Sequence, residues 1–358
     1  MQNDPHAHAA GPIPGRALDG PPVNFAVLGA GMIAEYHARA VQANQGLGAR
    51  LAAIGHYDRR RFDEIEARYG VPCRSEAELL ADPQVDVVCI CTPSGQHAAQ
   101  AIAAAEAGKH VLVEKPMATR VEDAQAMIAA CRANRVRLGV AYQSRTRPIF
   151  QRIRAAIAAG ELGELTLGLV NLPFYRPPAY YRQAAWRGTW AMDGGGALMN
   201  QGIHQVDLLG WFMGAPAAVT AHALTLQREI EVEDTLSASL RFPSGALAAI
   251  NATTTAAPGF PPRVEIYGTL GGVQVEGDTL MRWWTTDSRQ EPVEAPAGPA
   301  SAGAGADPRG IQLAGHTALV GDFIGAVREG RPPLVDGDEG LRSLAIVCEI
   351  YRQAGRIV

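Results

Sequence analysis

The sequence predicts an α/β protein with two domains: a doubly wound parallel sheet first, then an α+β domain with a large, mostly antiparallel open sheet. Three observations favour this fold class. Strand and helix patterns alternate from residue 24 to 141, as in a parallel sheet. A glycine-rich turn joins the first strand to its helix. After Tyr142, strands dominate, and the turn Phe242-Pro243-Ser244-Gly245 is typical of an antiparallel hairpin.

The bulk composition excludes several classes of protein. The formal net charge is -4 and charged residues make up 19%, so no basic field favours nucleic acid or an anionic membrane. No apolar stretch is long enough to span a bilayer. The five cysteines lack Cys-x-x-Cys spacing, which favours a reduced, cytoplasmic protein. Residues 1–22 lack the apolar core of a signal peptide, and we expect them to be a disordered lead.

The first strand, from Asn24 to Leu28, runs into Gly29-Ala30-Gly31-Met32-Ile33-Ala34 and a helix that reaches about residue 42. This is the fingerprint of a dinucleotide-binding (Rossmann) domain, with alanine at the third small position. Gly29 permits the tight turn and Gly31 lets a pyrophosphate approach the backbone. Met32 and Ile33 open the helix, whose free N–H groups attract phosphate. A tight turn without a ligand is the alternative interpretation.

The second strand, Leu51 to Tyr57, should carry the group that recognises the ribose. Asp58 could bind the ribose hydroxyls and favour NAD. Arg59 or Arg60 could instead bind a 2′-phosphate and favour NADP. Each arginine could equally belong to a solvated helix start.

The next strand, Asp86 to Cys91, leads into the turn Thr92-Pro93-Ser94-Gly95-Gln96-His97 and an alanine-rich helix to about residue 107. This turn lies at the carboxyl end of a strand, so Thr92, Pro93, Ser94 and His97 are candidates to line the nicotinamide side. A histidine bonded to nearby backbone is the alternative for His97.

The stretch Val111-Leu112-Val113-Glu114-Lys115-Pro116 predicts a buried strand that ends on a charged pair and a proline. Lys115 is therefore a candidate for chemistry, and a cis bond to Pro116 is plausible. Glu114 is expected on the nicotinamide side and not as a catalyst. A helix from Val121 to about residue 134 and a strand from Arg137 to Ala141 complete this domain.

The second domain should open with a helix over 148–159 and contain one long helix over about 197–213. We predict strands at 165–174, 217–227, 235–242, 246–254, 263–267, 272–276 and 280–284, a mobile Ala-, Gly- and Pro-rich loop at 295–310, and closing helices at about 317–329 and 339–354. We thus divide the chain into a lead (1–22), a dinucleotide-binding domain (23–142) and a substrate-binding and oligomerisation domain (143–358). The closing helices could pack back on the dinucleotide-binding domain.

The segment from Trp186 to Asp207 is dense in residues that can act chemically. Asn200 and His204 are four apart on the predicted helix and should share one face, with Asp207 three residues further on. A carboxamide and an imidazole can hold a hydroxyl and take its proton. A third metal ligand is missing, so we expect no metal site. The alternative for His204 is a histidine of the core whose ring nitrogens are hydrogen-bonded inside the protein.

Together these motifs resemble the glucose–fructose oxidoreductase/inositol dehydrogenase (Gfo/Idh/MocA) family. The resemblance rests on the fingerprint at 29–34, on Cys91-Thr92-Pro93-Ser94 with His97, on Glu114-Lys115-Pro116, and on Gly194-Gly195-Gly196 through His204 to Asp207. The closing run from Asp322 through Arg331-Pro332-Pro333 to Gly337 is also similar. The likeness covers nearly all of residues 22–358.

The resemblance implies an NAD- or NADP-dependent oxidoreductase that acts on a secondary alcohol of a sugar, cyclitol or related polyol. Lys115 corresponds to the catalytic lysine and His204 to the helix histidine. Asn200 stands where the family usually has an aspartate, so it can orient a hydroxyl but cannot serve as a base. With Tyr180-Tyr181 and Trp186-Arg187, this asparagine is similar to a subgroup that includes nucleotide-sugar 3-dehydrogenases. The usual acid after the second strand falls at His56, which leaves the choice of cofactor open, with NAD slightly favoured.

We therefore expect Lys115, His204 and Asn200 to form the catalytic set. Expected cofactor contacts are Gly29, Gly31, Met32, Ile33, Asp58, Arg59, Thr92, Pro93, Ser94, His97, Glu114 and Lys115. Candidate substrate contacts are Tyr142, Arg145, Arg147, Tyr180, Tyr181, Trp186, Arg187, Asn200, His204 and His316. The partners expected are a small-molecule sugar or polyol and a second copy, in a homodimer or homotetramer through the C-terminal sheet. The alternatives are a non-catalytic NAD(P)-binding regulator and an enzyme whose bound cofactor couples two substrates.

Overall fold

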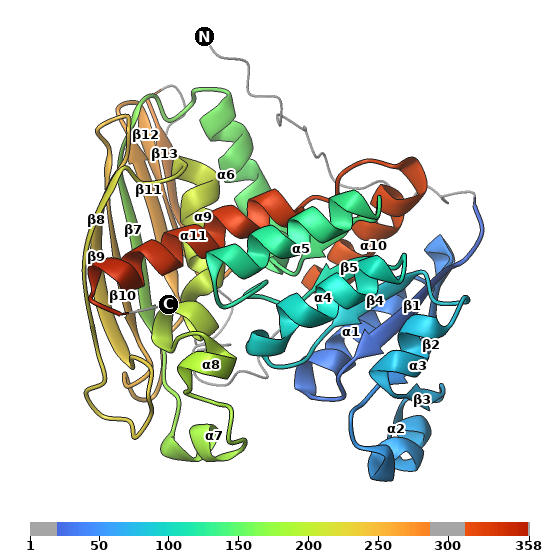
Figure 1. Ribbon diagram of the computed structural model, residues 1–358. Coiled ribbons are helices and arrows are strands. Elements are labelled where there is room, and N and C mark those ends of the chain that lie inside the picture. Colours follow the sequence, from blue (N-terminus) through green and yellow to red (C-terminus); the bar gives the residue numbers. More distant parts are fainter. Residues whose placement is uncertain (1–19, 287–311, 357–358) are drawn as a thin grey trace.

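The computed structural model describes residues 20–286 and 312–356, and two sheets organise the molecule (Figure 1). The N-terminal sheet has six parallel strands in the order β3-β2-β1-β4-β5-β6. Its strands are β1 (Val23–Leu28), β2 (Ala49–Gly55), β3 (Cys73–Arg74), β4 (Val87–Ile90), β5 (His110–Val113) and β6 (Leu138–Val140). The order reverses between β1 and β4, and open α/β sheets bind ligands in the crevice at this switch point.

Helices and short turns connect these strands and cover both faces of the sheet. They are α1 (Met32–Ala43), η1 (Gln45–Leu47), η2 (Arg59–Arg61), α2 (Phe62–Tyr69), α3 (Glu76–Ala81), η3 (Ser94–Gln96), α4 (His97–Glu106) and α5 (Val121–Ala133). Strand β4 is buried along its whole length, as expected of a strand covered on both faces. The two cysteines in and after it, Cys89 and Cys91, are buried and unpaired, and both are small core residues.

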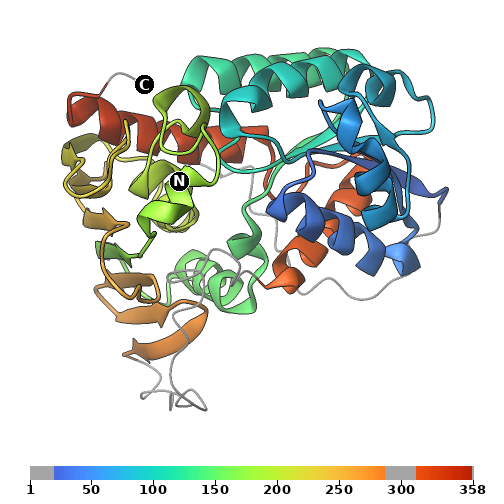
Figure 2. The same ribbon diagram turned by 90° about the horizontal axis from the view of Figure 1, so that it is seen from below.

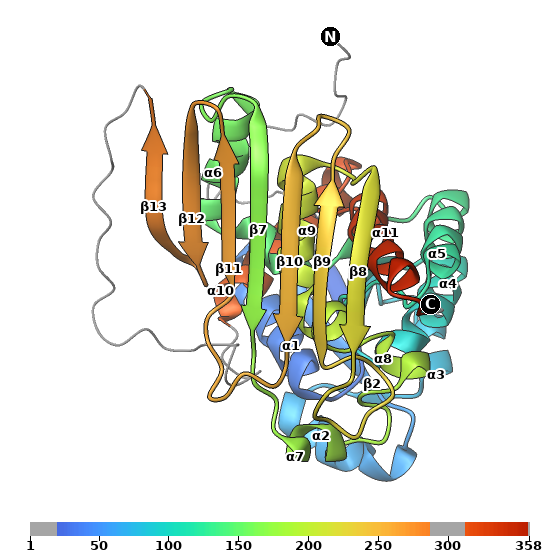
Figure 3. The ribbon, with the colours of Figure 1, turned by 90° about the vertical axis from the view of Figure 1, so that its left-hand side faces the viewer.

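The C-terminal sheet has seven strands in the order β13-β12-β11-β7-β10-β9-β8. They are β7 (Leu165–Pro173), β8 (Ala218–Leu224), β9 (Thr235–Arg241), β10 (Leu247–Thr253), β11 (Arg263–Gly268), β12 (Gly271–Glu276) and β13 (Thr279–Thr285). All neighbouring pairs are antiparallel except β7 and β10. Burial alternates along β8 and β9, so the inward side chains form a core and the other face of the sheet lies open (Figure 3).

The remaining helices cover the inner face of this sheet and link it to the first one. They are η4 (Gln143–Thr146), α6 (Pro148–Ala158), α7 (Pro178–Arg182), α8 (Trp190–Asp193), η5 (Ala197–Gly202), α9 (Ile203–Met213), α10 (Leu313–Glu329) and α11 (Gly337–Gln353). Helix α10 returns to the N-terminal domain and packs against α1 (Figure 2). Helix α11 packs against α5, α9 and β8, and so touches both domains. No helix in the described part of the chain combines the length and apolarity needed to cross a bilayer.

Several predicted elements differ from the structure. The strand predicted at 217–227 is shorter, β8 (Ala218–Leu224), and α2, β3, α3, α7 and α8 were not predicted. Strand β2 ends at Gly55, two residues early, because Asp58 caps the turn η2 that follows. Helix α10 begins at Leu313, before the predicted residue 317. The long helix predicted over 197–213 starts with a π-helical segment, η5, before α9. The lead before residue 20 and the loop at 295–310 lie outside the described residues.

Candidate active site

The glycine-rich turn leaves open space above the start of α1. Gly29 has a φ of 113°, and a Cβ there would lie 2.7 Å from the carbonyl oxygen of Cys91. Gly31 is the N-cap of α1, no side chain caps the helix, and a Cβ at Gly31 would meet nothing within 4 Å. Met32 is 40% exposed beside this opening and Ile33 is half-buried. The unpaired N–H groups of the helix start and this space fit the pyrophosphate of a dinucleotide.

The candidate ribose-binding residues after β2 interact with their neighbours. Asp58 accepts hydrogen bonds from Arg60 Nε and Nη2, both at 2.9 Å, and from the Arg60 amide. These contacts lower the pKa of Asp58 to about 2, so the carboxylate is ionised, and its side chain is 17% exposed. Arg59 forms an ion pair with Glu78 at 2.8 Å. Asp58 is thus placed to accept from ribose hydroxyls, whereas both arginines already have carboxylate partners.

The turn after β4 touches the second domain. A Cβ on Gly95 would lie 2.2 Å from the carbonyl oxygen of Ala191, so this turn and α8 pack backbone to backbone. Ser94 is buried, and the Thr92 hydroxyl donates to Gln100 at 2.6 Å. Only the backbone of Pro93 is a plausible ligand contact, since its ring has no polar atom.

His97 lies below this turn and faces the protein interior. Its Nδ1 is 2.8 Å from the carbonyl oxygen of Pro116, and its Nε2 is 2.8 Å from that of Thr92. Burial lowers its pKa. A neutral imidazole can donate to only one of these carbonyls, and the ring ties the two turns together. The geometry matches the alternative interpretation, a histidine bonded to nearby backbone.

Lys115 follows β5 and reaches into the second domain. Its bond to Pro116 is cis, as the sequence suggested. The ammonium nitrogen donates to the backbone oxygen of Asn200 at 2.9 Å, across 85 residues of sequence. Burial lowers the pKa of Lys115, while the carboxylates of Glu114 and Asp193 oppose this shift. The lysine is therefore held at the junction of the two domains with a weakened preference for its charged form.

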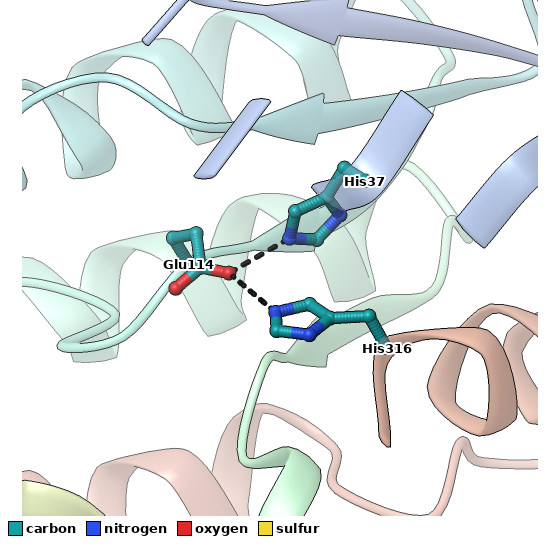
Figure 4. Close-up of side chains that lie close together, drawn as sticks. All are labelled: His37, Glu114 and His316. Atoms are coloured by element: carbon teal, nitrogen blue, oxygen red, sulfur yellow. Dashed lines mark hydrogen bonds and ion pairs between the residues drawn. The ribbon is translucent and has the colours of Figure 1, made fainter. Parts of the chain in front are cut away.

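Glu114 lies between two buried histidines (Figure 4). Its Oε1 is 2.7 Å from His37 Nε2 in α1 and 3.5 Å from His316 Nε2 in α10. Burial opposes ionisation of Glu114, but His316 and His37 outweigh it and hold its pKa well below the usual value. Burial also opposes the charge on His37, yet its pKa is raised because Cys91, Cys89 and Glu114 favour the charged form. Glu114 is consequently an ionised, interior carboxylate beside Lys115.

The same three groups could in principle surround a metal ion, since their ligand atoms lie within 4.8 Å of one another. Two ligands of a tetrahedral zinc, each at about 2.0–2.2 Å, stand roughly 3.3 Å apart. The 2.7 Å between His37 and Glu114 is instead an ordinary hydrogen-bond length. The cluster fits a hydrogen-bonded carboxylate better than a metal centre.

The segment that carries Asn200 is π-helical and starts from the triple glycine. A Cβ on Gly196 would lie 1.9 Å from the carbonyl oxygen of Glu233, so only glycine fits there. The buried Glu233 carboxylate accepts from the amides of Gly196 and Leu198 at 2.9 and 2.8 Å, and from Tyr351 at 2.8 Å. Glu233 therefore fixes the start of the segment that presents Asn200.

His204 opens α9 and meets Tyr142 edge-on, with ring centroids 5.9 Å apart. Burial, followed by the charge on Lys115, lowers the pKa of His204 to about 3, so the imidazole is neutral at neutral pH. Its Nδ1 and the Tyr142 hydroxyl are buried without a hydrogen-bond partner in the described part of the chain. Such unpaired buried polar atoms are costly, and a bound substrate could satisfy them.

Aromatic and cationic side chains from the loop before η5 complete the site. Arg187 stacks on the rings of Tyr180 and Trp186, 4.3 and 4.6 Å from their centroids, and donates to the Tyr180 hydroxyl at 2.6 Å. Its Nε is buried and, within residues 20–286 and 312–356, has no partner. Tyr181 donates to Thr254 at 3.0 Å. Arg187 therefore has a donor free for an anionic group.

One expected substrate contact, Arg145, is placed elsewhere. Arg145 is 2% exposed, pairs with Asp207 through Nε and Nη2 at 2.9 and 2.7 Å, and meets Glu339 at 2.5 Å. Its donors are thus used inside the protein, and we correct its assignment from substrate contact to structural ion pair. Asp207 belongs to that pair and not to the face of His204.

His316 is 1% exposed, and its Nε2 lies 3.5 Å from Glu114 Oε1. Both of its ring nitrogens are buried without a hydrogen-bond partner in the described part of the chain, so its assignment as a substrate contact stays a prediction. Arg147 forms an ion pair with Asp278 at 2.7 Å, and its charge is among those that lower the pKa of His204.

Several residues of the site escaped the sequence reasoning. Asp193 hydrogen-bonds the Asn200 carboxamide, and Gln201 donates to the Asn200 side-chain oxygen at 3.0 Å. Arg176 is buried and donates to Gln201 at 2.9 Å. Glu233 lies more than thirty residues from the segment that it supports. Of these residues, only Asp193 could have been noticed in the sequence, because it directly precedes the triple glycine.

The first domain has the fold of a dinucleotide-binding domain. Lys115 from this domain meets the segment with Asn200 and His204 from the second domain. This combination is typical of a two-domain, dinucleotide-dependent dehydrogenase. Residues 23–142 match the family model described as "Oxidoreductase family, NAD-binding Rossmann fold", and residues 150–274 match the GFO/IDH/MocA C-terminal domain. The chain belongs to the GFO/IDH/MocA family of NAD-binding oxidoreductases.

Named relatives support an oxidoreductase of sugars or cyclitols. The inositol 2-dehydrogenase of Rhizobium meliloti (strain 1021) is 28% identical over 92% of this chain and 96% of its own length. The 1,5-anhydro-D-fructose reductase of Ensifer adhaerens is 31% identical over 80% of this chain and 82% of its own. The WlbA dehydrogenase of Bordetella pertussis, solved with NADH and UDP-GlcNAcA, has a TM-score of 0.83 and 35% identity, covering 94% of this chain and 97% of that one. The chain is a sugar or polyol dehydrogenase with an NAD-binding domain.

Proposed function

We propose that this dehydrogenase transfers hydride between NAD and a secondary alcohol of an acidic nucleotide sugar. One observation carries the catalytic part of the proposal: Lys115 of the first domain bonds residue 200 of the second at 2.9 Å. With this contact, a buried cation lies beside Asn200, and its charge acts on His204, at the carboxyl end of β5, two strands from β1 in the sheet. Sugar oxidation needs such a polar site where a hydroxyl loses a hydride and a proton.

Each side chain has a proposed task. When bound, the nicotinamide ring supplies the hydride acceptor or donor. Lys115 donates a hydrogen bond to the reacting oxygen and stabilises the negative charge that develops on it. His204, neutral at neutral pH, takes the hydroxyl proton at a ring nitrogen. Asn200 cannot ionise and orients the sugar.

Arg187 supports an anionic sugar. Its guanidinium keeps a buried donor without a partner in the described part of the chain, and it lies over two aromatic rings. A guanidinium fixed in this way suits a carboxylate or phosphate, and the rings of Tyr180 and Trp186 suit the apolar faces of a sugar. The complex of the WlbA dehydrogenase with UDP-GlcNAcA, a protein 35% identical to this chain, favours a carboxylate on a nucleotide sugar over a neutral cyclitol.

NAD is the proposed cofactor, because the Asp58 carboxylate is ionised three residues after the end of β2, while Arg59 and Arg60 are paired with carboxylates. A 2′-phosphate would have to compete with those carboxylates and with the charge of Asp58.

A homodimer or homotetramer through the open sheet face is also proposed. Large apolar side chains lie exposed on that face: Leu167, Leu224, Leu247 and Trp284 are 37%, 53%, 52% and 50% exposed. Leu167 and Leu247 pair across neighbouring strands, while Leu224 lies at the opposite end of the strands. Exposed apolar side chains grouped on one face are typical of an interface.

The experiment that tests the function is a substrate panel followed by absorbance at 340 nm with NAD⁺ and with NADP⁺. The panel contains UDP-hexuronates, the matching neutral UDP-hexoses, free sugars and inositols, and the protein as isolated is checked for bound nicotinamide. We expect turnover with NAD⁺ and acidic nucleotide sugars. Turnover restricted to neutral cyclitols would refute the substrate class, and no turnover with any compound would refute the enzymatic function.

A further inference from the structure

Asp193 is a buried carboxylate in the candidate active site, and the proposed hydride transfer gives it no role. It ends the short helix α8 and is 2% exposed. Its Oδ2 accepts from the amide of Gly188 at 2.6 Å. Its Oδ1 accepts from the side-chain amide of Asn200. The two oxygens therefore serve two different purposes: one closes a turn, the other holds an active-site residue.

Hydrogen bonds hold both the backbone and the side chain of Asn200. Lys115 Nζ bonds its backbone oxygen at 2.9 Å, and Asp193 bonds its carboxamide nitrogen. The remaining Asn200 side-chain oxygen accepts from Gln201 Nε2 at 3.0 Å. Because the amide nitrogen points to Asp193, the orientation of the carboxamide is fixed, and so is the side that it can offer to a substrate.

The charges around Asp193 come from three segments. Lys115 after β5 and Arg187 before α8 are the cations that face it, and both act to keep it ionised. Glu114 lies beside Lys115, and Arg176 adds a further positive charge near the lysine. The Asp193 carboxylate thus compensates Lys115 from the second domain, while Glu114 does so from the first.

A purely structural role explains only part of this geometry. Closing the turn at Gly188 needs one carboxylate oxygen, and a neutral asparagine could supply it. A structural role alone would leave unexplained the bond between Asp193 Oδ1 and the Asn200 amide. It would also leave unexplained the negative charge next to the Lys115 ammonium group. Burying a carboxylate is costly, and this cost favours a role for the charge itself.

We propose that Asp193 is the positioning residue of this active site: its carboxylate fixes the Asn200 carboxamide and holds Lys115 in its charged form. This proposal rests on the proposed hydride-transfer function. It assigns to Asp193 the negative charge that Asn200, as an amide, cannot supply.

The pH dependence follows from the ionisation of Asp193. Burial raises the pKa of Asp193 to about 6, so the carboxylate loses its charge as pH falls through about 6. Protonation there removes the compensation of Lys115. Turnover should therefore decline on the acid side of about pH 6, and Asp193→Asn should abolish that acidic limb while lowering turnover at every pH by roughly 10- to 100-fold.

The lysine content of the chain permits a measurement that needs no activity. The sequence has two lysines, Lys109 and Lys115. Lys109 donates to the backbone oxygens of Asp82 and Val85, on another edge of the first domain, and serves as an internal reference. In protein made with ¹³C-labelled lysine, the Cε shift of Lys115 followed against pH reports its ionisation, with Lys115→Met used for assignment.

The experiment compares wild type, Asp193→Asn, the exchange variant Asp193→Asn/Asn200→Asp, and the exposed control Asp63→Asn. We expect Asp193→Asn to move the Lys115 titration to lower pH without moving Lys109, and to lower kcat while NADH affinity and Tm remain near wild type. The exchange variant returns a carboxylate to the same hydrogen-bonded pair and should recover part of the Lys115 shift and of the turnover.

Two outcomes would overturn the proposal: an unchanged Lys115 titration in Asp193→Asn, or a Tm loss that accounts for the whole loss of turnover and is not repaired in the exchange variant. Failure of the proposed function looks different, since wild type itself would then turn over no sugar. The lysine titration can still be read in that case.

Discussion

Lys115 has a specific environment that its sequence neighbours do not supply. It meets Asn200 through a backbone oxygen and Asp193 through charge, both in the second domain. Its pKa is lowered by burial, so it responds to small changes in the surrounding charges. For that reason the pKa of Lys115 depends on how the two domains pack against each other.

Lys115→Ala should lower kcat by roughly 100- to 10,000-fold, because it removes the donor that stabilises the developing oxyanion. NADH binding, measured by fluorescence titration, should stay close to wild type, since the pyrophosphate site lies at Gly29 and Gly31. The matched control is Lys109→Ala, which removes the other lysine. Near-normal turnover of Lys115→Ala would contradict the assignment.

Arg187 is expected to select the charge of the substrate. Arg187→Met should raise KM for an acidic nucleotide sugar by roughly 10- to 100-fold, as expected for the loss of a charged hydrogen bond, and change kcat less. Steady-state kinetics of the acidic sugar and of its neutral counterpart provide the measurement. Arg182→Met, an exposed arginine of α7, is the control. An equal rise in KM for both sugars would show that Arg187 does not read the charge.

Arg145 should behave as a stability residue. Replacing it with methionine leaves Asp207 buried and without its bidentate partner, which we expect to lower the free energy of unfolding by about 3–5 kcal/mol. Urea unfolding measures this loss. At a temperature where the variant is folded, KM should be unchanged. A raised KM without loss of stability would restore the interpretation as a substrate contact.

At the scale of elements, the π-helical segment η5 is the unusual part of the site. Its first amides bond Glu233 and not preceding carbonyls, and Tyr351 of α11 donates to the same carboxylate. This arrangement lets Asn200 and His204, which belong to two differently wound helices, converge. Single π-turns are often found at functional sites.

Glu233→Gln tests that arrangement. An amide nitrogen would face a donor N–H, so we expect a loss of about 1–3 kcal/mol in unfolding free energy and a lower kcat. Differential scanning calorimetry and turnover measure the two effects. Glu231→Gln, two residues away near the surface, is the control. Unchanged stability and turnover would mean that Glu233 does not hold η5.

At the scale of the whole molecule, the outer face of the C-terminal sheet is covered by no helix or strand within residues 20–286 and 312–356. Its exposed apolar side chains predict an oligomer that buries them. A Leu224→Glu/Leu247→Glu variant should lower the mass measured by light scattering, because buried like charges oppose association. Gln42→Glu on α1 adds charge away from the sheet and should leave the mass unchanged. A monomeric wild type would refute the prediction.

The sequence alone predicted the order of the main strands and helices and the dinucleotide turn, but not α2, β3, α3, α7 or α8. It also placed Lys115 directly after a strand, and Asn200 and His204 in one helical stretch. These follow from local rules: apolar periodicity, the steric freedom of glycine, and the way strand ends place side chains. The pairing of Arg145 with Asp207, the support of η5 by Glu233, and the contact of Asp193 with Asn200 were not predictable in this way. Each joins side chains whose chemistry suits several partners, and only the packing of the two domains chooses among them. Asp193 could therefore be read from the sequence only as one more acidic residue, while the tertiary structure brings its carboxylate to Asn200.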